Sequence, residues 1–268
     1  MDAAISIEHP ELMVTPWFMI AVLVLYLIFV LRIGPNFMLN RRPYELKTLI
    51  IVHNIVQVVS CVYVVYEILH ITENHIIYFW KCSALEFVGE KTKRHFKLAY
   101  FLFWLKLSEL IETIIFVLRK KQNQVTKLHV FHHISTITLI YLLINHNSNG
   151  FDALFPIFLN SIIHIIMYSY YLVAAVADKS IIRALTPVKK SITVMQMGQF
   201  SLILIHAILT SMNCGVDKAA FIYFIFVIIL MFYGFYDFYQ ISYKSSKRRK
   251  SAVVAESAEA AAAVNKTK

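Results

Sequence analysis

KLHVFHHIS, residues 127–135, places three histidines, His129, His132 and His133, at the head of a long apolar run. Their i, i+3, i+4 spacing puts the three imidazoles on one face of a helix, within an arc of about 100°. Titratable groups are costly in lipid and are rare there unless they have a task. We therefore interpret the cluster as a candidate site carried by a helix of a membrane bundle.

The rest of the chain has the composition of an integral membrane protein. It has 268 residues, of which 59% are hydrophobic, whereas soluble domains are usually about 45–50% apolar. Uncharged runs of roughly 18 residues or more predict membrane helices, and six are present: 12–31, 48–66, 128–151, 153–177, 191–216 and 219–236. A seventh segment, 98–118, is apolar but carries three charges. We predict an all-α integral membrane domain of seven transmembrane helices over residues 1–250, followed by a flexible, alanine-rich tail at 251–268.

Basic residues predict how the chain is oriented. The links between helices 1 and 2, 3 and 4, and 5 and 6 each hold four Lys or Arg, and the C-terminal stretch holds more. Cytosolic loops are enriched in these residues, so the N-terminus is expected in the lumen and the C-terminus in the cytosol. Loop 71–95 is an exception, because it also has four basic residues, Arg94 among them. The net charge of +10 fits topology signalling, and it also fits a landing site for an anionic lipid or a phosphate-bearing substrate.

Two of the three cysteines fall in predicted lumenal loops, where disulfides can form. We predict a bridge between Cys82 and Cys214, while Cys61 lies inside the second predicted helix. No Cys/His spacing typical of zinc sites is present in the sequence.

The third predicted helix carries charges on one side. In KLSELIET, residues 106–113, Lys106, Glu109 and Glu112 are spaced by three. An ion pair between Lys106 and Glu109 would offset the desolvation of both. It would leave Glu112 without a partner, so we expect one on another helix, such as a histidine of the cluster.

Helices 5 and 6 each add a polar stripe. These are Asn160, His164, Tyr168 and Tyr171 on helix 5, and Thr193, Gln196 and Gln199 on helix 6. Tyrosines are also common at membrane interfaces, and amides also hydrogen-bond between membrane helices. Polar stripes in lipid must turn inward, so helices 3 to 6 are predicted to enclose a polar site with an apolar tunnel. The scattered His53, His70, His146 and His206 are interpreted as satisfied core residues.

The histidines raise the question of a metal. Membrane desaturases and hydroxylases bind iron through many imidazoles in several clusters, and imidazole suits iron. This chain has 11 histidines but only one cluster, so we favour a site without metal. Imidazole alone can act as a base or nucleophile near neutral pH, and no cysteine lies near the cluster in the sequence. A di-iron desaturase or hydroxylase remains the alternative, and a seven-helix receptor or transporter shares the helix count.

Taken together, the motifs resemble those of the ELO family of very-long-chain fatty acid elongases. KLSELIET followed by Arg119 and Lys120 is similar to the family's KxxExxDT…RK, and residues 129–133 are similar to HxxHH. Residues 160–171 resemble NxxxHxxMYxYY, residues 193–199 resemble TxxQxxQ, and Gly34-Pro35 with Arg41-Arg42-Pro43 resembles the first cytosolic loop. Glu112 departs from the pattern, because the family usually has Asp there.

The resemblance implies a multi-pass protein of the endoplasmic reticulum membrane. It implies condensation of long-chain acyl-CoA with malonyl-CoA, with loss of carbon dioxide, to give 3-ketoacyl-CoA. Neither a metal nor a dissociable cofactor is implied. Expected partners are the two CoA thioesters, membrane lipid, other enzymes of the elongation cycle and a second copy of the chain, whereas nucleic acid is not expected.

Residue roles follow from this reaction. His132 is expected to take the acyl group as an acyl-imidazole, with His129 and His133 positioned by Glu109 or Glu112; direct condensation in a ternary complex is the alternative. His164, Asn160 and Gln196 are expected to stabilise the enolate or oxyanion. Substrate binding is expected from Lys106, Arg119, Lys120, Lys121, Tyr168, Tyr171, Thr193, Gln199, Lys189 and Lys190.

The sequence does not fix acyl chain length. Phe131 stands where many polyunsaturated-chain elongases have Tyr, which favours saturated or monounsaturated substrates.

Overall fold

The computed structural model describes residues 15–75, 79–80, 90–146, 153–213 and 218–245. All regular elements in these ranges are helical, which confirms the all-α prediction. In chain order they are α2 (Pro16–Ile28), η1 (Phe29–Ile33), α3 (Gly34–Met38), α4 (Lys47–Ile71), α5 (Glu90–Leu118), η3 (Gln122–Gln124), α6 (Lys127–His146), α7 (Leu154–Val176), α8 (Lys179–Ala184), α9 (Thr186–Asn213), α10 (Lys218–Tyr239) and η5 (Gln240–Ser245). Cys82, Cys214 and the predicted tail lie outside the described residues.

Six helical segments are long and apolar enough to cross a membrane. They are Pro16–Met38, Lys47–Ile71, Lys127–Asn145, Leu154–Val176, Thr186–Met212 and Lys218–Lys244. The segment α5 is not among them by this measure, although its 29 residues extend about 43 Å at 1.5 Å per residue. Charged residues, among them Lys106, Glu109 and Glu112 on one face of the helix, reduce the mean hydropathy of α5. Six candidate spans are therefore found among the described residues, and the seventh stays a prediction.

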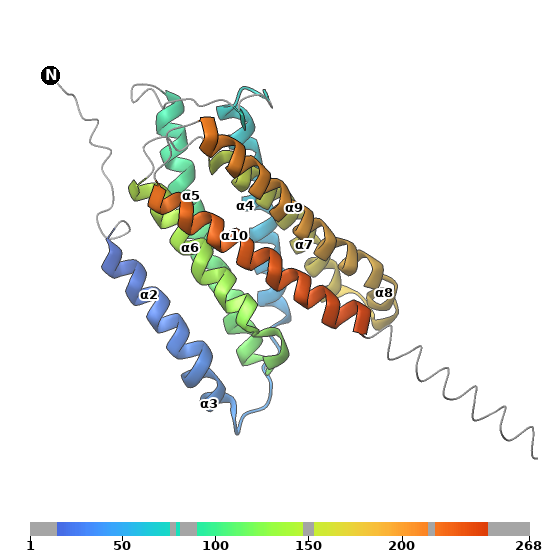
Figure 1. Ribbon diagram of the computed structural model, residues 1–268. Coiled ribbons are helices and arrows are strands. Elements are labelled where there is room, and N and C mark those ends of the chain that lie inside the picture. Colours follow the sequence, from blue (N-terminus) through green and yellow to red (C-terminus); the bar gives the residue numbers. More distant parts are fainter. Residues whose placement is uncertain (1–14, 76–78, 81–89, 147–152, 214–217, 246–268) are drawn as a thin grey trace, which may run out of the picture.

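Six helices form a closed ring. In the order α4, α5, α6, α10, α9 and α7, each packs on the next, and α7 packs back on α4. In Figure 1, α2 lies outside this bundle, alongside α6. The outer faces expose apolar residues such as Val59, Ile205 and Phe226, as expected for lipid contact. The ring thus includes α4 and α10 as well as the four helices predicted to enclose the site.

The first membrane segment continues through α2, η1 and α3 without a break, and its π-helical turn has a local cause. Pro35 lacks an N–H and its ring crowds the carbonyl four residues earlier, which favours a widened turn just before it. Gly34 lies tightly against α5: a Cβ there would come within 2.6 Å of Val117 Cγ1 and 2.9 Å of the Phe29 carbonyl oxygen.

Arg94 accounts for part of the unexpected charge in loop 71–95. It lies near the start of α5, and its guanidinium is 3.3 Å from Glu67 Oε2 on α4. This pair joins two ring neighbours, so Arg94 has a packing role at the predicted lumenal side.

Replacing Gly34 with Ala should destabilise the protein, whereas the same change at Gly198 should not. No atom lies within 4 Å of a Cβ built at Gly198, so that variant gains helix propensity alone. At Gly34 the clash with Val117 should outweigh this gain by about 1–3 kcal/mol. Thermal unfolding of the detergent-solubilised proteins compares the two. Equal unfolding midpoints would show that α3 and α5 can shift to accommodate the added methyl group without loss of stability.

Candidate active site

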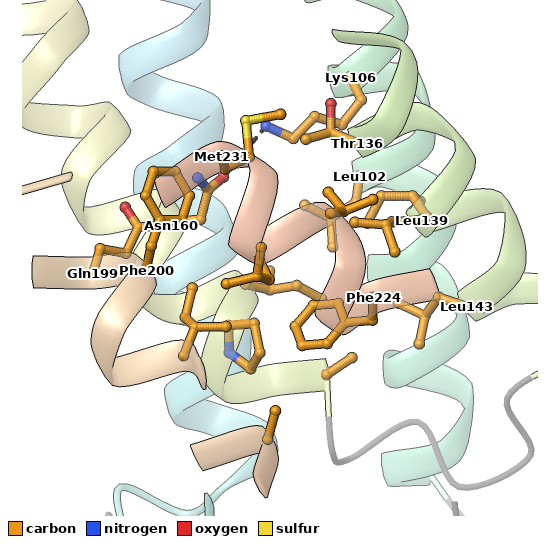
Figure 2. A pocket seen from close by; sticks show the side chains of 18 of the residues that line it. Leu102, Lys106, Thr136, Leu139, Leu143, Asn160, Gln199, Phe200, Phe224 and Met231 are labelled. Atoms are coloured by element: carbon orange, nitrogen blue, oxygen red, sulfur yellow. Dashed lines mark hydrogen bonds between the residues drawn. The ribbon is translucent and has the colours of Figure 1, made fainter. Parts of the chain in front are cut away.

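The ring encloses a cavity of about 220 Å³. Five predicted site residues line it: Lys106, His132, Asn160, His164 and Gln199. Figure 2 shows Lys106 and Asn160 pointing toward one another on one side of it, while Leu143 and Phe224 lie further along the wall. The cavity therefore has a polar end and an apolar remainder.

The polar end is organised by Glu109, which is fully buried. Its Oε1 lies 2.7 Å from Lys106 Nζ and 3.5 Å from His164 Nδ1. Lys106 Nζ also donates to Asn160 Oδ1 at 3.4 Å. The predicted ion pair is confirmed, and it also joins α5 to two polar residues of α7.

Glu112 finds its partner on another helix, as expected, but this partner is not a histidine. Its carboxyl group interacts with the hydroxyl of Tyr168 on α7. The Tyr168 ring is buried and lies 5.5 Å from the His164 ring and 6.0 Å from the Tyr171 ring. The two acidic residues of α5 thus hold two successive turns of α7.

The histidine cluster forms a row of rings on α6. The ring centroids of His129 and His133 are 4.5 Å apart, those of His132 and His133 are 5.4 Å apart, and His132 lies 6.4 Å from His164. Of the three, His132 lines the cavity. Its position opposite His164 makes it the cluster member best placed to meet a ligand.

His129 is held from the first membrane segment. The Tyr26 hydroxyl donates to Thr113 Oγ1 at 2.9 Å, and Thr113 Oγ1 lies 2.9 Å from His129 Nε2. No role for Tyr26 or Thr113 was predicted from the sequence. Thr113 ends the motif KLSELIET and could have been found there, whereas Tyr26 carries no signal in its own helix.

The residues predicted on α9 separate into two groups. Gln199 lines the cavity, whereas Gln196 Nε2 donates to Met167 Sδ at 3.7 Å and Thr193 Oγ1 donates to the carbonyl of Lys189. The Gln196 contact joins α9 to α7, and the Thr193 contact lies within α9 itself. Gln199 is therefore the amide of α9 in contact with the cavity.

Apart from Lys106, the predicted basic residues lie outside the cavity, at ends of helices. Lys120 adopts a positive φ of 55° at the end of α5, where its N–H and that of Lys121 close the helix on the carbonyls of Val117 and Phe116. Its Nζ donates to the carbonyl of Leu39. Lys190 Nζ lies 5.6 Å from the Tyr239 ring. Arg119, Lys121 and Lys189 do not line the cavity either.

The contribution of α4 to the site was not predicted from the sequence. His53, Asn54, Gln57 and Cys61 are all buried, and Cys61 lines the cavity with His132. A cysteine thus lies near the site despite its distance in sequence. The four α4 residues have the spacing i, i+1, i+4, i+8 in an apolar helix. A polar stripe of this kind predicted inward-facing site residues on the other helices, and it could have done so here. His53 is not a satisfied core residue, because its Nε2 has no hydrogen-bond partner among the described residues.

Two other histidines allow the same comparison. His206 is satisfied as expected, because its Nε2 lies 2.7 Å from the carbonyl oxygen of Phe79. His70 is exposed, so its assignment to the core is wrong.

Within the described ranges, no group of three or more His, Cys, Asp or Glu side chains is arranged to hold a metal ion. The arrangement instead offers facing imidazoles, a buried ammonium group and side-chain amides beside an apolar chamber. Such groups can carry out acid–base and nucleophilic chemistry on the polar end of an otherwise apolar molecule.

Comparisons with known proteins agree on one family. The ELO family model, described as GNS1/SUR4 family, matches residues 11–251. The chain is similar to very long chain fatty acid elongase F of Drosophila melanogaster, with 35% identity over 206 residues, 76% of this chain and 79% of that protein. It is also similar to very long chain fatty acid elongase 1 of Homo sapiens, with 35% identity over 201 residues, 75% and 71% of the two chains. Very long chain fatty acid elongase 7 of Rattus norvegicus is 32% identical over 225 residues, 83% and 79%.

Replacing Lys106 with Met should destabilise the protein strongly, because Glu109 would be left as a buried, unpaired charge. Breaking such a pair typically costs about 3–5 kcal/mol. The double variant Lys106→Met/Glu109→Gln should regain much of this loss, and Lys121→Met, at an exposed lysine, should change little. Unfolding midpoints of the three variants test the pair. If the double variant is less stable than Lys106→Met, the charges do not act on each other as described.

Proposed function

The chain belongs to the ELO family (GNS1/SUR4), and from that premise we propose that it condenses a long-chain acyl-CoA with malonyl-CoA. Carbon dioxide is lost and 3-ketoacyl-CoA is formed. Family membership and the six apolar helices make the chain a multi-pass membrane enzyme of fatty acid elongation. The malonyl donor, the endoplasmic reticulum as its location and the chemical steps below are parts of the proposal. It rests mainly on the pair His132 and His164, which face one cavity with a polar end and an apolar body.

In the first step, an imidazole nitrogen of His132 attacks the thioester carbonyl. The carbon–sulfur bond breaks, and the proton of the other ring nitrogen goes to the departing CoA thiolate, which leaves an acyl-imidazole and free CoA. Lys106 lines the same end of the cavity and supplies positive charge for the transient oxyanion. Glu109, 3.5 Å from His164 Nδ1, fixes the orientation of the facing imidazole.

In the second step, malonyl-CoA loses carbon dioxide and its enolate carbon attacks the acyl carbon. The bond between the acyl carbon and the His132 nitrogen breaks, and the released imidazolate takes up one proton from solvent to become neutral imidazole again. Asn160 and His164 line the cavity and can stabilise the enolate oxygen. We assign the third such role to Gln199 in place of Gln196, because Gln196 is engaged by Met167.

Condensation in a ternary complex, with an imidazole acting only as base, is the alternative. Neither route calls for a metal, so elemental analysis of active enzyme should find no stoichiometric iron.

The apolar part of the cavity has a measurable depth. On each of four helices, one lining residue at the polar end of the cavity and one at the opposite end are eleven residues apart. These pairs are His132 and Leu143, His164 and Ala153, Gln199 and Thr210, and Met231 and Ala220. Eleven residues correspond to about 16 Å of helix. An extended hydrocarbon advances about 1.3 Å per carbon, because bonds of about 1.5 Å meet at a tetrahedral angle. The cavity therefore accepts about 12–13 carbons in extended form.

Replacing His132 with Ala should abolish incorporation of labelled malonyl carbon, by at least about 1000-fold, because residues that act as one catalytic unit give losses of this size. His75→Ala, at an exposed histidine, is the matched control. Retained activity in His132→Ala would remove this residue from the reaction. Failure of the wild type with every acyl-CoA offered would contradict the proposed function.

Intact mass spectrometry after incubation with acyl-CoA alone distinguishes the two routes. The covalent route gives an acyl adduct in the wild type and in Cys61→Ala, and none in His132→Ala. Loss of the adduct in Cys61→Ala would assign the acyl group to the thiol. A wild type without adduct that still condenses would support the ternary route.

Replacing Ala207 with Leu should lower activity in a way that depends on chain length. Ala207 is buried and lines the cavity eight residues beyond Gln199, which is about 12 Å and about nine carbons deep. Substrates of 16 carbons should lose at least about tenfold in kcat/KM relative to those of 8 carbons, because the added side chain occupies the deep end. Ala219→Leu, at an exposed position on α10, is the control. An equal loss at all lengths would mean that the acyl tail does not reach Ala207.

A further inference from the structure

Buried polar atoms without a hydrogen-bond partner are concentrated in one part of the ring. Among the described residues, six such atoms belong to neighbouring turns of α4, α5, α6 and α7: His53 Nε2, Asn54 Nδ2, Gln57 Oε1, Glu109 Oε2, His133 Nδ1 and His164 Nδ1. Of these, His164 Nδ1 makes the electrostatic contact with Glu109 Oε1 at 3.5 Å but no hydrogen bond. Each unpaired atom of this kind costs about 1–3 kcal/mol, and water is scarce in a membrane bundle. Three of the six lie on catalytic candidates, and the other three lie on α4.

The three α4 residues form a ridge, which we call the α4 ridge: His53, Asn54 and Gln57. Their side chains share one face of the helix, and they are 8%, 3% and 0% exposed. Cys61, one turn further along the same face, lines the cavity. In the other direction α4 begins at Lys47, which follows Arg41 and Arg42. The ridge residues do not themselves line the cavity, but along α4 they lie between its reactive end and the basic segment before Lys47.

The chemistry of the α4 ridge suits a neutral polar chain. Gln57 Nε2 donates to Ser108 Oγ at 2.9 Å, so its Oε1 is the atom left to accept a hydrogen bond. Asn54 Nδ2 is left to donate one. No member of the α4 ridge has a permanent charge. A donor and an acceptor in succession are complementary to amide groups, each of which has one carbonyl and one N–H.

A CoA thioester contains such a chain between its sulfur and its phosphates. The pantetheine arm carries two secondary amides whose centres are four bonds apart, about 5 Å in extended form. Asn54 and Gln57 are three residues apart, about 4.5 Å along the helix axis. Twelve bonds separate the sulfur from the first phosphate oxygen, about 15 Å. From Cys61, this length along α4 ends near Ile51, about 6 Å short of Lys47 along the helix axis. A lysine side chain can span that gap.

We propose that the α4 ridge is the binding site for the pantetheine arm, with Asn54 Nδ2 donating to one amide carbonyl and Gln57 Oε1 accepting from the N–H of the other. This assignment rests on the proposed function, since it requires a CoA thioester as substrate. It gives α4 a task in substrate binding that none of the recognised motifs assigns to it. The His53 ring lies 6.1 Å from the Tyr168 ring, so the α4 ridge packs against α7.

Calorimetric titration of the full chain in detergent tests the assignment without depending on turnover. The probes are three unreactive thioethers with the same dodecyl tail, made from CoA, pantetheine and mercaptoethanol. Wild type should bind S-dodecyl-pantetheine at least about tenfold more tightly than S-dodecyl-mercaptoethanol. Asn54→Leu should raise Kd about five- to thirtyfold for the CoA and pantetheine probes, as expected for loss of one buried hydrogen bond, and leave the mercaptoethanol probe unchanged.

Two more variants complete the test. Gln57→Met keeps the length of the side chain and should repeat the pattern of Asn54→Leu. Lys47→Met should weaken binding of the CoA probe alone. Equal affinity of wild type for the pantetheine and mercaptoethanol probes overturns the assignment, as does an equal change for all three probes in both ridge variants. If the probes bind as expected but wild type incorporates no malonyl carbon, the binding site stands and the proposed reaction fails.

Discussion

The buried ion pair between Lys106 and Glu109 is the interaction on which the rest of the site depends. Both groups lie inside a bundle whose outer surface is apolar, so neither charge is tolerated without the other. Their contact fixes the rotation of α5 in the ring. With that rotation set, Lys106 also reaches Asn160 and Glu109 also reaches His164. One interaction within a single helix thereby brings α5 and α7 into register.

The ring creates two environments in one chamber. Charged and hydrogen-bonding groups gather at one end, while the wall toward Leu143, Thr210 and Ala220 is apolar or self-satisfied. A thioester and its hydrocarbon tail have the same division, because the reactive carbonyl needs polar neighbours and the tail does not. Because these groups lie inside the bundle and away from bulk water, every electrostatic contact made there is also strengthened. The same architecture that excludes lipid from the polar groups therefore serves the proposed chemistry.

The buried polar atoms without hydrogen-bond partners reduce the stability of the fold, and they are concentrated around the site. Elsewhere in the described structure most buried polar groups are paired, as with His206 and Phe79 or Tyr26 and Thr113. Departures from complete pairing tend to occur where a protein binds its ligand. The α4 ridge follows this rule although it lies in a helix that appears in the sequence to be only a membrane span.

The sequence by itself determined the helices and the residues that share a face of each. The backbone fixes the spacing within a helix, so the grouping of His129, His132 and His133 and the pairing of Lys106 with Glu109 could be predicted from residue numbers alone. Only the tertiary structure decided which faces meet. Glu112 has Tyr168 as its partner. The cavity is lined by Gln199 and not by Gln196, and Cys61 lines it from α4. These outcomes depend on the order of helices in the ring and on the rotation of each one, which are set by side-chain packing between segments far apart in the chain.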